Sequence, residues 1–198
     1  MKASFTTLAA LLLILLTTAC SSTRKTVATE LEKARFERYA EDGVWELRAH
    51  WARPFARSSM NAIASAGLLP PGSTGTSISL TGNSAYLKIE KDSVFANLPY
   101  FGERQMISGF GTGDVGINFK GVPKDFQITF DEDKQWYNFT FSIKNEVGEH
   151  FTVNGQLLQN LRSRFTVRSS QRFSITYDAH IKEPAKSAAS TQSIPSAP

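Results

Sequence analysis

Period-two alternation of apolar and polar residues is the feature that most constrains the fold of this chain. Residues 44–52 place four apolar side chains on one face, namely Trp45, Leu47, Ala49 and Trp51. Strict alternation of this kind is typical of a β-strand with one buried face. The pattern recurs at 115–119, 126–130, 137–143, 151–153, 161–167 and 173–181, with shorter candidate strands at 78–80, 87–89 and 94–98.

The connections between these candidate strands indicate an antiparallel sheet. Turn residues such as Gly121-Val122-Pro123 and Asp131-Glu132-Asp133 separate neighbouring strands. These linkers are too short for the crossover that a parallel pair needs. We therefore expect a mainly β domain over residues 29–182, built as an antiparallel β-sandwich or a partly open barrel. The chain contains 14 Phe, which predicts an aromatic core.

Polar and apolar spacing also predicts one short helix before the first strand. Residues 29–42 carry apolar side chains at roughly helical spacing, with charged residues between them. Thr29 followed by Glu32 fits a capping box. At the other end of the chain, residues 183–198 are rich in Pro, Ala and Ser without any period, which predicts a disordered tail.

The N-terminus has the composition of a secretory signal. Lys2 precedes the apolar run Leu8–Leu16, and small residues follow. This order predicts a signal peptide over residues 1–19. The run is too short for a permanent membrane span, which needs about 20 apolar residues.

Cys20 is the single cysteine of the chain, and it directly follows the small residues of the predicted cleavage site. This arrangement resembles the lipobox of bacterial lipoproteins, which implies acylation of Cys20 and a lipidated tether over residues 20–28. Two or more acyl chains give stable anchoring. Ser21 and Ser22 resemble the sorting residues of outer-membrane lipoproteins. The alternative is a secreted protein with one odd thiol.

The charge and the histidines argue against several other classes of protein. The net charge of +4 is too small to indicate nucleic-acid binding. His50, His150 and His180 are far apart in the sequence, so we predict no metal site and no cofactor. A Gly-x-Ser-x-Gly elbow is absent, and no catalytic residues are predicted.

The stretch "NLPYFGERQ" is the first candidate binding site. Pro99 and Gly102 interrupt the strand pattern around the adjacent aromatics Tyr100 and Phe101. One interpretation is an aromatic lip for a ligand, with Arg104 as the partner of an anion. The other, which we favour, is a corner that closes one end of the sheet with aromatic side chains.

A set of arginines is the second candidate site. The arginines of this set are Arg162, Arg164, Arg168 and Arg172. All four have even numbers, whereas the residues predicted to point inward in the same segments have odd numbers. We expect them to share one outward face with His180. Such a face can hold anionic lipid headgroups or lipopolysaccharide phosphates, since Arg binds phosphate in a bidentate manner. A solvated basic face is the favoured alternative.

Three stretches give the chain a family resemblance: "LPYFG" at 98–102, "VGINFKG" at 115–121 and "RFSITYDAHI" at 172–181. Over about residues 30–182 the chain resembles family 4251 of the domains of unknown function, which occurs in envelope lipoproteins of Bacteroidota. The resemblance implies a β-rich domain and an envelope location. It implies no activity.

We predict a lipid-anchored periplasmic β domain without enzymatic activity, in an outer-membrane lipoprotein that faces the periplasm. Its role would be to bind a lipid, a hydrophobic ligand or an envelope protein. The alternatives are a structural or assembly factor of the outer membrane and an unrecognised hydrolase. A hollow interior near Tyr100 and Phe101 would favour a ligand-binding role, whereas a close-packed interior would favour a role at the surface.

Overall fold

The structure is a computed structural model that describes residues 29–55, 58–105 and 116–182. The predicted signal peptide, the lipidated tether with Cys20 and the predicted disordered tail lie outside the described residues.

Ten strands form one sheet within the described residues, and every pairing is antiparallel. The strands are β1 (Val44–Pro54), β2 (Ile78–Ser79), β3 (Tyr86–Glu90), β4 (Ser93–Leu98), β5 (Ile117–Gly121), β6 (Lys124–Asp131), β7 (Trp136–Lys144), β8 (His150–Leu158), β9 (Arg162–Ser169) and β10 (Ile175–Ile181). Nine of them follow the order β5-β4-β3-β1-β10-β9-β8-β7-β6, and the short β2 pairs with β1.

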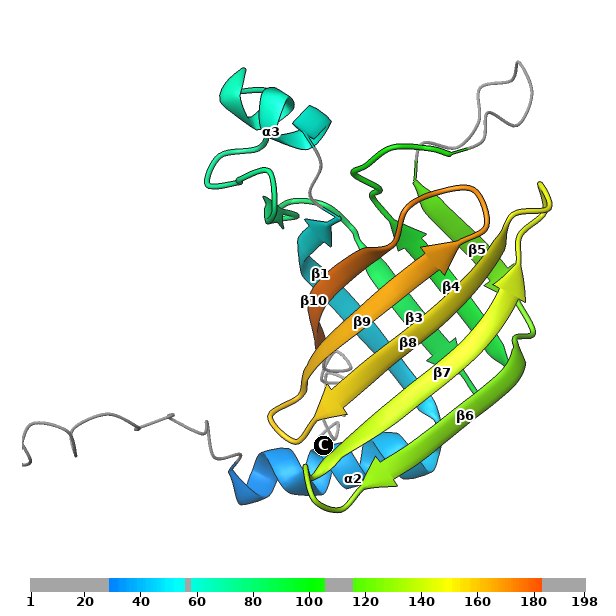
Figure 1. Cartoon of the computed structure of the whole chain (residues 1–198). Coiled ribbons are helices and arrows are strands. Elements are labelled where there is room, and N and C mark those ends of the chain that lie inside the picture. The colour runs from blue at the N-terminus through cyan, green and yellow to red at the C-terminus, as the bar shows by residue number, and fades with distance from the viewer. Residues whose placement is uncertain (1–28, 56–57, 106–115, 183–198) are drawn as a thin grey trace, which may run out of the picture.

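The sheet curls into a half-barrel, so that β3, β4 and β5 lie across from β7 and β8 (Figure 1). The mainly antiparallel β fold is confirmed, and the curled single sheet corresponds to the partly open barrel rather than to two separate sheets. Aromatic pairs connect the two sides across the interior. The ring centroids of Phe119 and Phe141 are 6.1 Å apart, and those of Trp45 and Phe139 are 5.1 Å apart.

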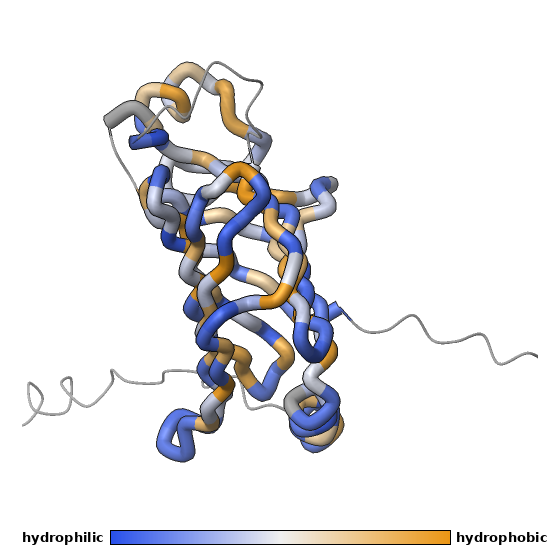
Figure 2. Tube along the Cα trace, turned by 90° about the vertical axis from the view of Figure 1, so that its right-hand side faces the viewer, coloured by the Kyte–Doolittle hydropathy of each residue, from blue (hydrophilic) through white to orange (hydrophobic). Residues whose placement is uncertain are grey.

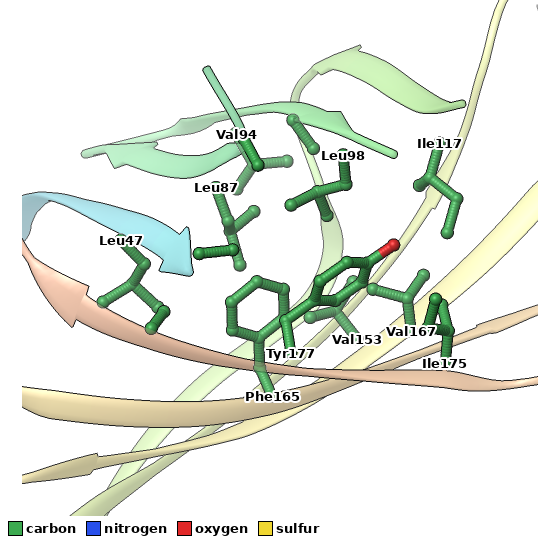
Figure 3. Close-up of a cluster of buried hydrophobic side chains, with 14 of the residues drawn as sticks. Leu47, Leu87, Val94, Leu98, Ile117, Val153, Phe165, Val167, Ile175 and Tyr177 are labelled. Carbon is green, nitrogen blue, oxygen red and sulfur yellow. The ribbon is translucent and has the colours of Figure 1, made fainter. Parts of the chain in front are cut away.

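Apolar side chains fill the inside of the curl. The tube in Figure 2 alternates between hydrophobic and hydrophilic residues along the strands, as the sequence predicted. Phe165 and Tyr177 are fully buried and lie among other buried side chains, with Leu87 and Leu98 from β3 and β4 and Leu47 from β1, the strand next to β10 (Figure 3). Because protein interiors pack as densely as organic crystals, these large rings occupy the space that a ligand would need.

The predicted inward residues of β6 are less buried than those of the other strands. Phe126 and Ile128 are half-buried, and Phe130 is 42 % exposed. β6 is the last strand at one end of the sheet order, so it has a hydrogen-bonded neighbour on one side only.

Helix α2 (Glu30–Asp42) confirms the predicted N-terminal helix and its capping box. The backbone N–H of Glu32 donates to Thr29 Oγ1 at 3.2 Å, and the backbone N–H of Thr29 donates to Glu32 Oε2 at 2.8 Å. Gly43 ends the helix with a φ of 62°, which a residue with a side chain rarely adopts. α2 lies across one end of the half-barrel (Figure 1), where Phe36 packs on Tyr137 with ring centroids 4.9 Å apart.

A second helix, α3 (Ser58–Ser65), lies at the opposite end of the sheet (Figure 1). Met60 is buried, whereas Ile63 and Leu68 are exposed. No helix among residues 29–55, 58–105 and 116–182 is long and apolar enough to cross a bilayer.

Candidate functional site

The aromatic corner that the sequence singled out is held in place by hydrogen bonds. Tyr100 and Phe101 are half-buried and pack against the core. The Tyr100 hydroxyl donates to the carbonyl of Glu103 at 2.9 Å and lies 3.2 Å from that of Phe173. A side chain at Gly102 would force the Tyr100 ring to shift, because its Cβ would lie 2.8 Å from the Tyr100 hydroxyl oxygen. These contacts describe a corner that closes one end of the half-barrel, and a role in ligand binding stays a prediction.

Tyr177 supports this corner from the core. Its hydroxyl donates to the carbonyl of Pro99 at 2.7 Å. Burial raises the pKa of Tyr177 well above its ordinary value, so the phenol stays protonated and keeps donating this bond. The corner is thereby tied to the most buried part of the sheet.

The predicted outward position of Arg172 is wrong. The side chain is buried, and its Nε and Nη2 donate to the two carboxylate oxygens of Glu149 at 2.8 and 2.9 Å. Its Nη1 donates to the carbonyl of Gly116 at 2.7 Å. The even-odd rule fails here because β9 ends at Ser169 and β10 begins at Ile175, so Arg172 lies between strands.

The buried Arg172 joins the two candidate sites. Its guanidinium lies 5.3 Å from the centre of the Tyr100 ring, a cation–π distance. The exposed Arg104 pairs with Arg172 through an isolated backbone bridge. Sequence reasoning missed the partner Glu149, although its odd position continues the inward alternation of Phe151 and Val153.

The other three arginines lie where the alternation placed them. Arg162, Arg164 and Arg168 are exposed on the outer face of β9, while the intervening Ser163, Phe165 and Val167 are buried. His180 is also exposed, directly opposite Arg162 on β10. The outward placement is confirmed for these residues, and their binding role stays a prediction.

A β-bulge in β1 brings a further arginine to this face. Ala49 pairs with Ala179, but Trp51 pairs with Asp178, so His50 is an extra residue. The bulge inverts the alternation, and the expectation that Trp51 faces inward with Trp45 is wrong. After the bulge Ala52 is fully buried and Arg53 is exposed. Bulges commonly re-aim side chains in this way.

Asp178 holds two arginines side by side on the outer face. Arg53 Nε donates to its Oδ2 and Arg164 Nε donates to its Oδ1, both at 2.6 Å. Burial alone would raise the pKa of Asp178, but the hydrogen bonds from Arg164 and Arg53 outweigh it and hold this pKa below its ordinary value. The aspartate is therefore ionised at neutral pH and fixes both guanidinium groups.

These residues line a half-open groove of about 630 Å³ on the outer face of β1, β10, β9 and β8. The groove contains Arg53, Arg162 and Arg164 against the single carboxylate of Asp178. We call it the arginine groove. Its volume falls in the range of small-molecule sites, roughly 300–1,000 Å³. The sequence did not identify Arg53 as a member of this site, because the β-bulge that turns it outward has no clear sequence signal. It also did not identify Asp178, although the even position of this residue predicts that it points outward.

His50 forms another wall of the arginine groove. Its ring centroid lies 5.4 Å from that of His180. Burial, followed by the nearby His180, lowers the pKa of His50, so the ring is neutral at pH 7. Among the described residues, no group of three or more His, Cys, Asp or Glu side chains is placed to hold a metal ion.

Comparison with known proteins places the chain in a family. The model of the family described as "Domain of unknown function (DUF4251)" matches residues 28–181. A similar fold occurs in the crystal structure of a DUF4251 family protein from Bacteroides eggerthii, with a TM-score of 0.52 and 12 % sequence identity, covering 76 % of this chain and 87 % of that one. No curated protein matches the chain. The chain therefore belongs to the DUF4251 family, whose function is unknown.

Proposed function

We propose that this protein is a non-enzymatic binding domain, anchored to an envelope membrane through an acylated Cys20, that binds an anionic group in the arginine groove. The observation that carries the proposal is the arrangement of Arg53 and Arg164 around Asp178. Each arginine uses its Nε for the aspartate. Among the described residues no hydrogen bond involves the Nη atoms of these two arginines, which leaves them available to a ligand.

The chemistry of this arrangement suits a phosphate. Arginine presents its N–H groups as a planar fork that matches the oxygens of phosphate or carboxylate. The side chains of Arg53 and Arg164 are 46 % and 60 % exposed, so an anion can reach them. Arg162 adds a third guanidinium on the same groove. It interacts electrostatically with Glu32, which does not line the groove. The three arginines exceed the one carboxylate, so the groove keeps positive charge for a ligand.

The filled interior supports a role at the outer surface. Phe165 and Tyr177 occupy the inside of the half-barrel, and Tyr100 and Phe101 close one end of it. The sequence left open whether a ligand binds inside the sheet or on its outer surface. These contacts favour binding on the outer surface, because side chains fill the interior that a hydrophobic ligand would occupy. A structural or assembly role in the outer membrane is a second candidate, because a packed interior suits it equally.

The envelope location of the proposal is supported by the N-terminal sequence. Lys2, the apolar run Leu8–Leu16 and Cys20 have the order of a lipoprotein signal. We propose that the acylated protein sits in the outer membrane and faces the periplasm. Helix α2 begins at Glu30, which leaves a short connection between the lipid and the domain.

Titration of the purified protein with inorganic phosphate, followed by calorimetry or NMR, tests the binding function. We expect Arg53→Gln and Arg164→Gln each to weaken phosphate binding about tenfold, as the loss of a charge-assisted hydrogen bond predicts. Arg168→Gln is the matched control, because this exposed arginine lies on the same strand as Arg164 but does not line the groove. Equal losses for all three variants, or no phosphate binding by the unaltered protein, would refute the proposal.

A further inference from the structure

A second hollow adjoins the arginine groove on the same outer face. It measures about 390 Å³ and lies over β6, β7, β8 and β9. Gln156 and Arg164 line both hollows, so a single ligand can reach from one into the other. We call this second hollow the amide hollow.

Cross-strand pairing builds the amide hollow from two rows of polar side chains. In one row Thr140 of β7 lies opposite Asn154 of β8, which lies opposite Thr166 of β9. In the other row Asn138 lies opposite Gln156, which lies opposite Arg164. Because directly paired residues stand on the same face of a sheet, both rows point outward together.

The amides of these rows have hydrogen-bonding capacity to spare. The Thr140 hydroxyl donates to Asn154 Oδ1 at 2.9 Å. The side chains of Asn138 and Gln156 make no hydrogen bond with any residue that the structure describes. Each amide offers two N–H donors and a carbonyl acceptor. The hollow therefore presents both hydrogen-bond donors and acceptors.

This lining selects among ligand classes. Arg164 is the one ionisable residue that lines the amide hollow, so the rest of the lining carries no charge and suits an uncharged polar group. Amides and hydroxyls match sugar hydroxyl groups, which both donate and accept hydrogen bonds, and they do not suit a lipid tail. An extended peptide would instead be expected to pair with an edge of the sheet, whereas the hollow lies on its face.

We infer that the outer face binds a phosphorylated saccharide, with the phosphate in the arginine groove and a sugar ring in the amide hollow. The inference rests on the proposed anion-binding function and adds the ligand class to it. Arg164 stands where the two hollows meet, so the phosphate and the ring of one ligand are neighbours there.

The test compares three probes on the purified full chain: inorganic phosphate, glucose and glucose 6-phosphate. We expect glucose 6-phosphate to bind at least tenfold more tightly than phosphate, and glucose alone to bind weakly. Two variants, Asn138→Val and Asn154→Val, remove amides that line the amide hollow and not the arginine groove, while keeping residues that strands tolerate on an outer face. Both should abolish the gain that the sugar provides and leave the affinity for phosphate within twofold.

Thr152→Val is the matched control. Thr152 is also a half-buried polar residue on the outer face, on the same strand as Asn154, but it lines neither hollow. This variant should keep the full preference for glucose 6-phosphate.

The outcomes separate the two proposals. If glucose 6-phosphate binds no more tightly than phosphate, the saccharide inference is wrong and the anion-binding function stands. If neither phosphate nor glucose 6-phosphate binds, both the anion-binding function and the saccharide inference are wrong. Vesicles of phosphatidylglycerol provide the remaining arm, with phosphatidylcholine vesicles as the neutral comparison. Arginine-dependent binding to the anionic vesicles, with no effect of Asn138→Val, would assign the phosphate to a lipid headgroup and overturn the inference.

Discussion

Arg172 and Glu149 form a bidentate ion pair whose side chains are 4 % and 1 % exposed. Glu149 immediately precedes β8, and Arg172 lies between β9 and β10. Arg172 also donates to the carbonyl of Gly116, just before β5. The Arg172 guanidinium thus connects the start of the edge strand β5 to the start of β8. It also lies beside the Tyr100 ring. The pair closes the end of the half-barrel where the aromatic corner lies.

Removal of one partner of this pair is expected to destabilise the protein severely. Arg172→Leu leaves the Glu149 carboxylate buried without its countercharge, which costs about 3–5 kcal/mol of unfolding free energy. Urea unfolding at neutral pH measures the change. Arg168→Leu is the control, since exposed substitutions usually change stability by about 0.5 kcal/mol or less. A loss for Arg172→Leu no larger than that of the control would contradict the assignment of the pair.

The double variant Glu149→Leu/Arg172→Leu adds a further prediction. Replacement of both partners leaves no unpaired buried charge, and such replacements are often close to neutral. We expect the double variant to be more stable than Arg172→Leu alone, although Gly116 loses a hydrogen bond in both. A strictly additive loss in the double-mutant cycle would show that the two residues do not interact.

Asp178 should make stability depend on pH at the acidic end. Its pKa in the folded protein is lowered, so the stabilisation is fully present above the ordinary aspartate pKa of about 4 and is lost as the pH falls through the lower folded value. Unfolding curves measured at pH 7 and at several values below pH 4 follow this loss. Asp178→Asn should flatten this part of the profile, and an unchanged profile would show that another carboxyl group causes it.

Gly155 cannot accept a side chain without repacking the core. A Cβ at this position would lie 2.2 Å from Phe139 Cζ and 2.7 Å from Phe165 Cβ. Gly155→Ala should therefore cost about 1–3 kcal/mol of stability through overpacking. Adding Phe139→Leu should restore part of the loss, because the smaller side chain makes room for the methyl group. Thermal unfolding that ranks the double variant below Gly155→Ala would contradict this explanation.

The membrane attachment that we propose depends on acylation of Cys20. Cys20→Ser should move the protein from the membrane fraction to the soluble fraction of the cell, because the acyl chains provide the anchoring free energy, about 0.8 kcal/mol for each buried methylene. Mass spectrometry of the native protein should show acyl mass on residue 20 and no residues 1–19. An intact Met1 would refute the proposed processing.

Local periodicity carried most of the fold prediction. The alternation around Phe139, Phe165 and Tyr177 identified strands and their buried faces, because the side-chain period of a strand is a property of the backbone itself. The capping box of Thr29 and Glu32 located the start of α2 for the same reason, since its hydrogen bonds join residues three apart. Local rules also placed Arg162, Arg164 and Arg168 on the outer face.

Local rules failed where distant segments determine the structure. The sequence by itself determined the strands, the first helix, the mainly antiparallel sheet and the outward arginines of β9. The tertiary structure alone decided that one sheet curls around a packed interior, that Arg172 is buried against Glu149, and that a bulge turns Arg53 outward to Asp178. These contacts join residues up to 125 positions apart, and their energies depend on burial and pairing that exist only after the chain has folded.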